Sequence, residues 1–247
     1  MALYDNIGRG YAMHRRPDPR IAAAIRASLG DAASVVNVGA GSGSYEPEQT
    51  VLAVEPSEVM IRQRPSGAAP CVCGTAEAIP LGPRAVDAAM AVLCVHHWPD
   101  LERGLREMTR VAMKRVVLLT WVPDSPAFWL TRDYFPEIAG HDRTIFPTSD
   151  VLAGMLTGIV GPTVIRPVPV PHDCVDGFLC AYWRRPERYL NAEVRGAMSS
   201  FARIDASEGL ARLCEDLSSG RWTERNRDLL ELDSMDLGYR LAICEVR

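Results

Sequence analysis

The sequence predicts an α/β protein built on a mostly parallel β-sheet, and the first observation behind this class is the stretch 35–43. Residues 35–38 (Val-Val-Asn-Val) are almost entirely apolar, as expected for a strand that is covered on both faces. Glycines follow at every second position, where a backbone without Cβ can adopt positive φ and let a ligand approach closely. Such a turn lies at the carboxyl edge of the strands, where open α/β sheets bind ligands.

The second observation is that further apolar segments alternate with helical patterns. Strands are predicted at 51–54, 71–73, 86–92 and 116–121, and residues 101–112 repeat apolar side chains at helical spacing. Only 12 residues, 39–50, separate the first strand from the second, close to the minimum for a βαβ crossover. Because Pro47 restricts this connection further, we expect one or two helical turns beginning near Ser44.

Residues 1–33 read as a helical lid that precedes the first strand. Pro19 suits the first turn of a helix and Gly30 suits its end. Between the two parts of this segment lie His14, Arg15 and Arg16. They form either a solvated charge cluster or, with Tyr11, a closure over a ligand in which Arg15 matches a carboxylate.

The second strand ends in an acid, Glu55, followed by Pro56 and Ser57. An acid at the tip of this strand can accept hydrogen bonds from both hydroxyls of a ribose. The alternative is that Glu55 only caps the helix that begins at Ser57, through the helix dipole. With the glycine turn in front of it, the pattern favours ribose binding.

Four motifs, taken in order, resemble a known family. They are V-V-N-V-G-A-G-S-G at 35–43, V-L-A-V-E-P-S-E-V-M at 51–60, G-T-A-E-A-I-P-L at 74–81 and V-D-A-A-M-A-V-L-C-V-H-H-W-P-D at 86–100. The chain is similar to class I S-adenosylmethionine-dependent methyltransferases of the ubiquinone/menaquinone-biosynthesis type (methyltransferase type 11 group). It departs from them at Asn37, where the family usually has Asp, and at 112–115, where it has Pro-Gly-Gly. The resemblance implies a Rossmann-like, seven-stranded sheet with helices on both faces.

The resemblance also implies S-adenosyl-L-methionine as cofactor. The glycine turn would face its methionine part, Glu55 its ribose, and the loop after the third strand its adenine, while the exit of the fourth strand would lie near the sulfonium. The predicted cofactor-binding residues are Tyr11, Arg15, Asn37, Gly39, Ala40, Gly41, Gly43, Glu55, Pro56, Thr75, Ala76, Val92, Leu93 and His97.

His96 and His97 follow the fourth strand directly and are the candidate catalytic bases. A general base raises the rate of a reaction by about 10²–10⁴-fold, in addition to the acceleration that comes from positioning the reactants. The predicted activity is methyl transfer to a small-molecule acceptor, whose reacting atom (O, N, C or S) stays open. The alternatives are a cofactor-binding protein without catalysis and a nicotinamide-dependent oxidoreductase. Against the latter, Ser44 stands where Gly-x-Gly-x-x-Gly requires its last glycine.

The second half carries the candidate substrate-binding residues. Residues 126–138 are rich in aromatic side chains and predict a lid helix, although the same aromatics could be ordinary packing residues. A helix at 149–156, an irregular strand at 163–170 and a last strand at 238–246 follow. Between the last two strands, 174–236 has a helical pattern and is predicted as a cap inserted in a single domain, 1–247. The candidate substrate-binding residues are Trp121, Trp129, Tyr134 and His172.

The composition limits the kinds of partner that we expect for this protein. The net charge of -4 and the lack of a basic stripe disfavour nucleic acid, and no apolar run is long enough for a membrane span or signal peptide. The seven cysteines form no Cys-x-x-Cys and indicate reduced thiols in a cytoplasmic protein. The cluster at 172–176 reads as a turn rather than a metal site, because metal ligands must converge. We expect a monomer or homodimer with no metal.

Overall fold

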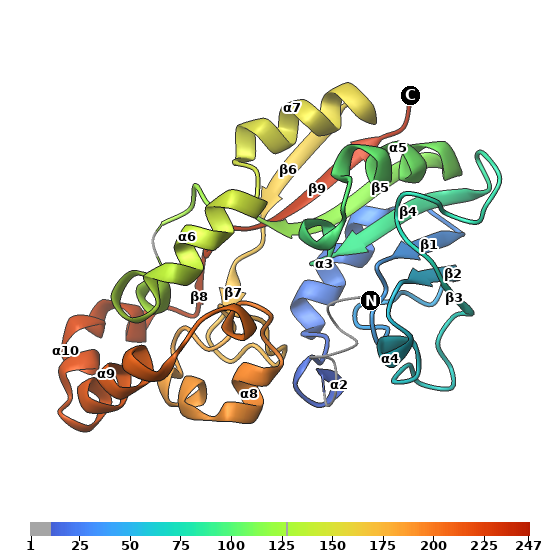
Figure 1. Cartoon of the computed structure of the whole chain (residues 1–247). Coiled ribbons are helices and arrows are strands. Elements are labelled where there is room, and N and C mark those ends of the chain that lie inside the picture. Colours follow the sequence, from blue (N-terminus) through green and yellow to red (C-terminus); the bar gives the residue numbers. More distant parts are fainter. Residues whose placement is uncertain (1–10, 127) are drawn as a thin grey trace.

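The computed structural model describes residues 11–126 and 128–247, with only the backbone of residues 11 and 12. Its centre is a seven-stranded sheet in the order β3-β2-β1-β4-β5-β9-β6 (Figure 1). All neighbouring strands run parallel except β9, which is antiparallel to both β5 and β6. The predicted Rossmann-like, mostly parallel sheet is therefore confirmed. The strands are β1 (Val35–Val38), β2 (Thr50–Glu55), β3 (Cys71–Cys73), β4 (Val86–Val92), β5 (Ala112–Trp121), β6 (Thr163–Pro167) and β9 (Tyr239–Glu245).

Helices cover both faces of this sheet, because the side chains of β4 alternate between two apolar layers. Ala88 and Met90 pack with α3 (Pro19–Leu29) on one face. Ala89 and Ala91 pack on the other face with α5 (Leu101–Val111) and α7 (Ser149–Ile159) (Figure 1). Asp18 caps α3 by accepting from the Arg20 N–H, and Asp100 caps α5 in the same manner.

The connection between β1 and β2 differs from the prediction. Residues 39–49 contain turns and no helix. The prediction of one or two helical turns near Ser44 is therefore wrong. Gly39, Gly41 and Gly43 all have positive φ, and Tyr45 follows with a φ of 61°, which keeps this connection out of helical geometry. The first helix after β2 is the single turn α4 (Glu58–Ile61).

The strand predicted at 163–170 is divided in two. Pro167 ends β6, and a short β7 (Val170–Pro171) pairs instead with β8 (Ser234–Met235) in a separate two-stranded sheet. Prolines lack the N–H that a ladder needs, so the chain leaves the large sheet here. Residues 174–236, which we call the cap, follow β7 and include β8 near their end.

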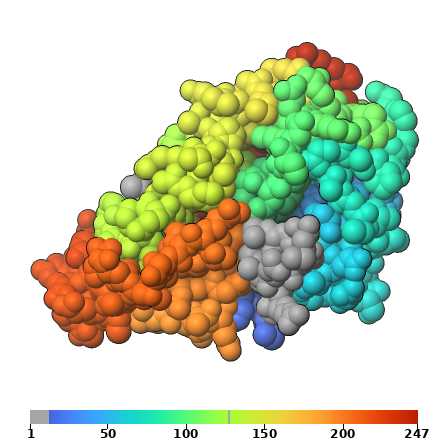
Figure 2. All heavy atoms as spheres, in the orientation of Figure 1, coloured from blue at the N-terminus to red at the C-terminus, as the bar shows by residue number. Residues whose placement is uncertain are grey.

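The cap lies beyond the end of β5 and is mainly helical. It contains α8 (Ala192–Gly196), α9 (Ser207–Ser218) and α10 (Arg221–Arg225), joined by turns (Figure 1). In the space-filling view its orange surface meets the yellow-green segment before α7 (Figure 2). Instead of one helix over 126–138, that segment has a π-helical turn, Leu130–Tyr134, followed by α6 (Pro136–Ile145).

The cap shares one apolar core with the sheet and α3, since Trp183, Met90 and Ile25 belong to the same cluster of buried residues. From outside the cap, the Trp129 indole N–H donates to the Trp183 carbonyl at 2.8 Å, and the Trp129 ring packs edge-on against Trp222. The cap and the sheet are therefore continuous through one buried core, and a single domain stays a prediction.

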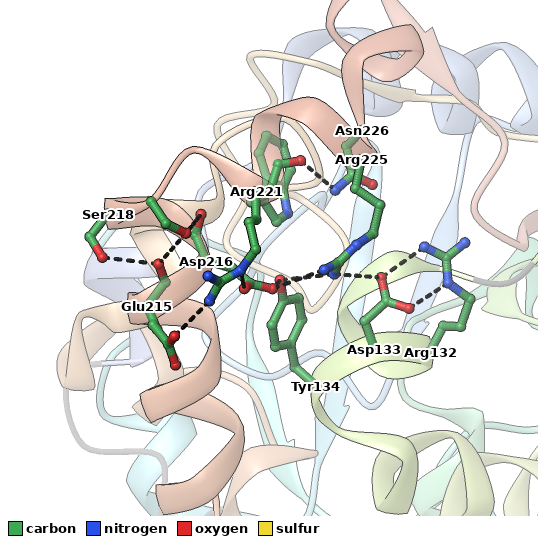
Figure 3. Close-up of polar contacts among 11 residues, drawn as sticks. Arg132, Asp133, Tyr134, Glu215, Asp216, Ser218, Arg221, Arg225 and Asn226 are labelled. Carbon is green, nitrogen blue, oxygen red and sulfur yellow. Dashed lines mark hydrogen bonds and ion pairs between the residues drawn. The ribbon is translucent and has the colours of Figure 1, made fainter.

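A polar network fastens α9 and α10 to the π-helical turn (Figure 3). The Tyr134 hydroxyl donates to the Asp216 carboxylate at 2.7 Å, and the same carboxylate receives Arg221 at 2.7 Å and Arg225 at 3.2 Å. Arg225 also lies 3.8 Å from Asp133, on the π-helical turn itself. The Tyr134 side chain therefore helps to hold the cap against the π-helical turn.

Candidate functional site

A cavity of about 930 Å³ opens at the carboxyl ends of β1, β2 and β4, which we call the strand-edge cavity. The order of the sheet reverses between β1 and β4, and α/β sheets bind ligands at such a switch point. Most of the residues predicted for the cofactor line this one cavity: Arg15, Asn37, Gly39, Ala40, Gly41, Glu55, Pro56, Thr75, Ala76, Val92, Leu93 and His97.

The glycines of the turn have different roles. At Gly39, an added Cβ would lie 2.6 Å from the Cys94 Sγ, so packing excludes a side chain there. At Gly41, which has a φ of 53°, the nearest atom to such a Cβ is the Met60 Cε at 3.3 Å. Gly43 is not among the residues that line the cavity, which corrects its predicted role. Its φ of 92° identifies it as a turn residue.

Glu55 organises the wall of the cavity between β1 and β2. One carboxylate oxygen accepts the Gly41 N–H at 2.8 Å, and the other accepts the Ser57 N–H at 2.9 Å. The side chain thus holds the glycine turn and also precedes α4, where Ser57 itself is the N-cap. The sequence left two roles open for Glu55, lining a ligand site or interacting with the start of a helix. In the structure Glu55 both lines the cavity and stands before α4.

Asn37 has a structural reason to replace the usual Asp. Its side-chain N–H donates to the Glu46 carboxylate at 3.0 Å, and Glu46 is paired with Arg64 at 2.7 Å. All three side chains are buried or nearly so. A carboxylate at 37 would face a second carboxylate in a desolvated place, whereas an amide supplies the hydrogen-bond donor.

Arg15 reaches the strand-edge cavity, but its charge is matched within the protein. Its Nε donates to Asp176 at 2.6 Å, and the Tyr45 hydroxyl donates to the other oxygen of that carboxylate at 2.9 Å. The match of Arg15 to a ligand carboxylate stays a prediction, because the residue also lines the cavity. The predicted partner, the side chain of Tyr11, lies outside the described residues.

A second cavity, which we call the inner cavity, lies between β5, α6 and the cap. Its apolar wall includes Trp121, Phe128, Phe146, Phe178 and Tyr239. It shares a border with the strand-edge cavity, because both are lined by Arg15, Leu93, His96, His97 and Arg203.

Leu93 stands at that border in a strained conformation. Its φ of 52° is uncommon for a residue with a side chain, and its N–H is held by the Leu119 carbonyl at 2.7 Å. Strain of this kind costs of the order of 1–3 kcal/mol and concentrates at functional sites. It turns the chain out of β4 and into the 3₁₀ turn that carries the two histidines.

His96 and His97 lie on the 3₁₀ turn Val95–His97, with ring centroids 3.8 Å apart. Phe146 packs against the His96 ring at 4.6 Å, and the buried His96 Nδ1 has no hydrogen-bond partner among the described residues. Burial, with the nearby charges of Arg203 and Arg15, lowers the pKa of His97 to about 4. Burial and the same charges, together with His97, lower the pKa of His96 well below its usual value. Both rings are neutral at neutral pH.

Only one of the four predicted substrate-binding residues lines the inner cavity, and it is Trp121. Trp129 and Tyr134 are 2% and 3% exposed and pack inside the cap, so their assignment to the cavity wall is corrected. His172 lies at the β7–β8 pair, with its Nδ1 3.2 Å from the Asp233 carbonyl, and lines neither cavity. Aromatic composition alone did not distinguish the packing rings from the cavity rings.

Phe146, Asp142 and Arg203 also line the inner cavity, although the sequence did not predict them as site residues. Asp142 had a usable signal, since it stands one helical turn after the buried Ile138 and takes a position that an apolar residue would normally fill. Arg203 had none. No metal-binding cluster of His, Cys, Asp or Glu occurs among the described residues, and Asp173 is paired with Arg20 at 2.7 Å. Within the described part of the chain, no helix is both long enough and apolar enough to span a bilayer.

Comparison with known proteins agrees with this geometry. The methyltransferase-domain family model matches residues 36–120. A protein from Anabaena variabilis ATCC 29413, assigned to an antibiotic biosynthesis pathway as a methyltransferase, is 34% identical. The match covers 94% of this chain and 98% of that one, with a TM-score of 0.87. No curated protein matches the chain.

More distant structures share the fold. A SAM-dependent methyltransferase from Thermotoga maritima is 16% identical with a TM-score of 0.59, over 99% of this chain and 98% of that one. A geranyl diphosphate C-methyltransferase from Streptomyces coelicolor A3(2), bound to S-adenosyl-L-homocysteine, is 16% identical with a TM-score of 0.52, over 92% and 77%. The chain belongs to the class I S-adenosylmethionine-dependent methyltransferases. It is a methyltransferase whose cofactor is S-adenosyl-L-methionine, and the nicotinamide alternative is set aside.

Proposed function

We propose that this enzyme transfers a methyl group to a small-molecule acceptor that binds in the inner cavity. The observation that carries the proposal is the shared border at Leu93, His96 and His97, where an apolar, aromatic cavity meets the strand-edge cavity. Small-molecule sites are concave and mostly apolar with a few polar groups, as this cavity is. The motifs at 35–100 resemble those of the ubiquinone/menaquinone-biosynthesis type, which supports that subgroup within the class.

The strand-edge cavity suits the cofactor. Gly41 lines this cavity without a side chain, so a ligand can approach its backbone closely, and the Glu55 carboxylate stands where a ribose can donate two hydrogen bonds. Thr75 and Ala76, after β3, line the same cavity and would hold the adenine. When bound, S-adenosylmethionine supplies an electrophilic methyl group on its sulfonium.

The protein's main contribution would be positioning. Phe146, Trp121 and Phe128 form a wall that excludes water and restricts the orientation of an acceptor at the border of the two cavities. Holding two reactants in line can supply about 7–11 kcal/mol of the barrier. A closed aromatic wall also keeps water from competing for the methyl group.

His96 and His97 are the proposed proton acceptors. Both line both cavities, and both are neutral at neutral pH because burial disfavours the imidazolium. A neutral ring can accept a hydrogen bond from the acceptor's nucleophilic group and take its proton as the group is methylated. His96 is the stronger candidate, since its Nδ1 is buried without a hydrogen-bond partner in the described structure.

The test is a two-stage measurement on the purified protein. Calorimetry with S-adenosylmethionine and NADH first checks the cofactor, and only the former should bind. Transfer of a labelled methyl group is then measured on a panel of small aromatic alcohols, phenols and amines, beside RNA and protein acceptors. His96→Gln should lower kcat for an accepted compound and leave cofactor affinity unchanged. Labelling of RNA or protein alone would contradict the proposal.

A further inference from the structure

A buried acid on α6 plays no part in the function described so far. Asp142 is 7% exposed and lines the inner cavity. It also lines a neighbouring hollow, which we call the outer cavity and which Glu137, Ile138, His141, Ser200, Arg203 and Ile204 complete. Among residues 11–126 and 128–247, nothing forms a hydrogen bond or an ion pair with its carboxyl group.

Such a group is costly to the fold. A buried carboxyl without a partner loses its hydration and gains nothing in return, so natural cores rarely keep one. Burial raises the pKa of Asp142 to about 6, and the positive charge of Arg203 acts in the opposite direction. At neutral pH the group is still mainly ionised. An ionised, largely buried acid on the wall of an apolar cavity is typical of a ligand-binding site.

The position of Asp142 determines which part of a ligand it meets. His96 and His97 line the strand-edge and inner cavities, whereas Asp142 and His141 line the inner and outer cavities. An acceptor whose reacting atom lies beside the histidines therefore presents a different part to Asp142. The carboxylate can only accept hydrogen bonds, so that part must carry a donor.

The charges around Asp142 indicate what kind of donor fits. Arg203 lines all three cavities, and no described residue forms a salt bridge with it. Its positive charge opposes a second cation in the same space. The buried Nε2 of His141, which has no hydrogen-bond partner in the described structure, is a further polar atom facing both cavities. A neutral hydroxyl satisfies Asp142 without adding positive charge.

We propose that Asp142 is a specificity-determining residue that accepts a hydrogen bond from a neutral hydroxyl of the acceptor, at a point remote from the methylated atom. The acceptor is then a small molecule with an apolar, aromatic-compatible body and polar groups at both ends. This inference rests on the proposed function, because it takes the inner cavity as the acceptor site.

Three probes of one shape test it: 4-ethylphenol, 2-(4-hydroxyphenyl)ethanol and tyramine. Their binding is measured by calorimetry on protein saturated with S-adenosylhomocysteine. The alcohol should bind about 10- to 100-fold more tightly than 4-ethylphenol, the range for a hydrogen bond to a charged group. Tyramine should show no such gain. Asp142→Leu should abolish the preference, and Asp142→Asn, which keeps an accepting oxygen, should retain part of it.

Asp228→Asn is the matched control, since it makes the same chemical change on the exposed surface and should preserve the preference. Equal binding of the alcohol and 4-ethylphenol, including no binding of either, would overturn the inference. So would an unchanged preference in Asp142→Leu with a native circular dichroism spectrum, or tightest binding of tyramine. Failure of the proposed function is visible separately, as loss of S-adenosylhomocysteine binding or as methylation of macromolecules alone.

Discussion

The Arg15 Nε lies 2.6 Å from the Asp176 Oδ1, and the two side chains are 10% and 0% exposed. This ion pair joins the segment before α3 to the start of the cap. Tyr45, from the turn after β1, donates to the same carboxylate at 2.9 Å. Three segments that border the two cavities therefore meet at one buried group. We infer that the cap and the glycine turn hold their relative positions through this carboxylate.

The first prediction follows from that pair. Asp176→Asn removes the negative charge of a buried ion pair beside the Arg15 guanidinium, so the free energy of unfolding should fall by about 3–5 kcal/mol. Urea denaturation measures the loss. The matched control is Asp173→Asn, whose pair with Arg20 is half exposed and should contribute little to stability. Equal losses in the two variants would show that Asp176 has no special role.

The second prediction concerns the glycine turn. A valine at Gly41 would place a side chain in the wall of the strand-edge cavity, with its Cβ 3.3 Å from the Met60 Cε and at a φ of 53°, so S-adenosylmethionine binding should be lost. Calorimetry tests this on protein shown by circular dichroism to be folded. Gly67→Val is the control, because a Cβ there meets open space. Retained affinity in Gly41→Val would place the cofactor elsewhere.

The third prediction assigns Glu55 to the cofactor. Glu55→Ala should weaken binding of S-adenosylmethionine by about 1.5–3 kcal/mol, the scale for hydrogen bonds to a charged group. The variant also loses the carboxylate that holds the Gly41 and Ser57 N–H groups, so its stability is measured in parallel without ligand. Glu48→Ala, at an exposed position, should bind normally. Normal affinity in Glu55→Ala would remove this acid from the ribose.

The fourth prediction is a pH dependence of stability with a defined sign. The folded-state pKa of Asp142, about 6, exceeds its ordinary value of 3.8, so the folded protein binds the extra proton between these values. Stability from this group should therefore fall by about 2 kcal/mol as pH rises from 4 to 6. Buried histidines act with the opposite sign, because the His97 pKa is lowered to about 4 and the unfolded state binds that proton first.

The two contributions are separated by comparing variants. Thermal or urea unfolding of the wild type and Asp142→Asn is measured from pH 4 to 7, and the groups common to both cancel in the difference. The wild type should lose stability relative to the variant as pH rises. The groups that face Asp142 are Arg203, His141 and Glu137, and Arg203 reduces the size of the effect. A flat difference would mean that the carboxyl is not desolvated.

The fifth prediction distinguishes a cavity ring from a packing ring. Phe146→Ala opens the wall of the inner cavity beside His96 and should lower turnover of an accepted compound with cofactor affinity unchanged. Trp129→Ala empties the cap core instead and should cost about 3–5 kcal/mol of stability. Kinetics and denaturation of the two variants give opposite patterns. Substrate discrimination that follows Trp129 rather than Phe146 would contradict the assignment of the cavity.

The sequence by itself determined the fold class and the edge of the sheet that carries the site. The apolar run at 35–38, the glycines after it and Glu55 at the end of β2 are local patterns, and backbone geometry converts them directly into a strand, a turn and an acid at one edge. The same holds for 86–92, whose exit carries His96 and His97. Parallel strands share an edge, so elements far apart in sequence meet there without further information.

Only the tertiary structure decided which side chains face the cavities. Trp129 and Phe146 are both aromatic residues between β5 and α7, yet one is in the cap core and the other is beside His96. Arg15 and Asp176 are 161 positions apart, and no local pattern pairs them. Asp142, on α6, lines a cavity only because residues of the cap, among them Ser200 and Arg203, complete its wall. Side-chain direction depends on how distant elements pack, and packing is a property of the whole chain.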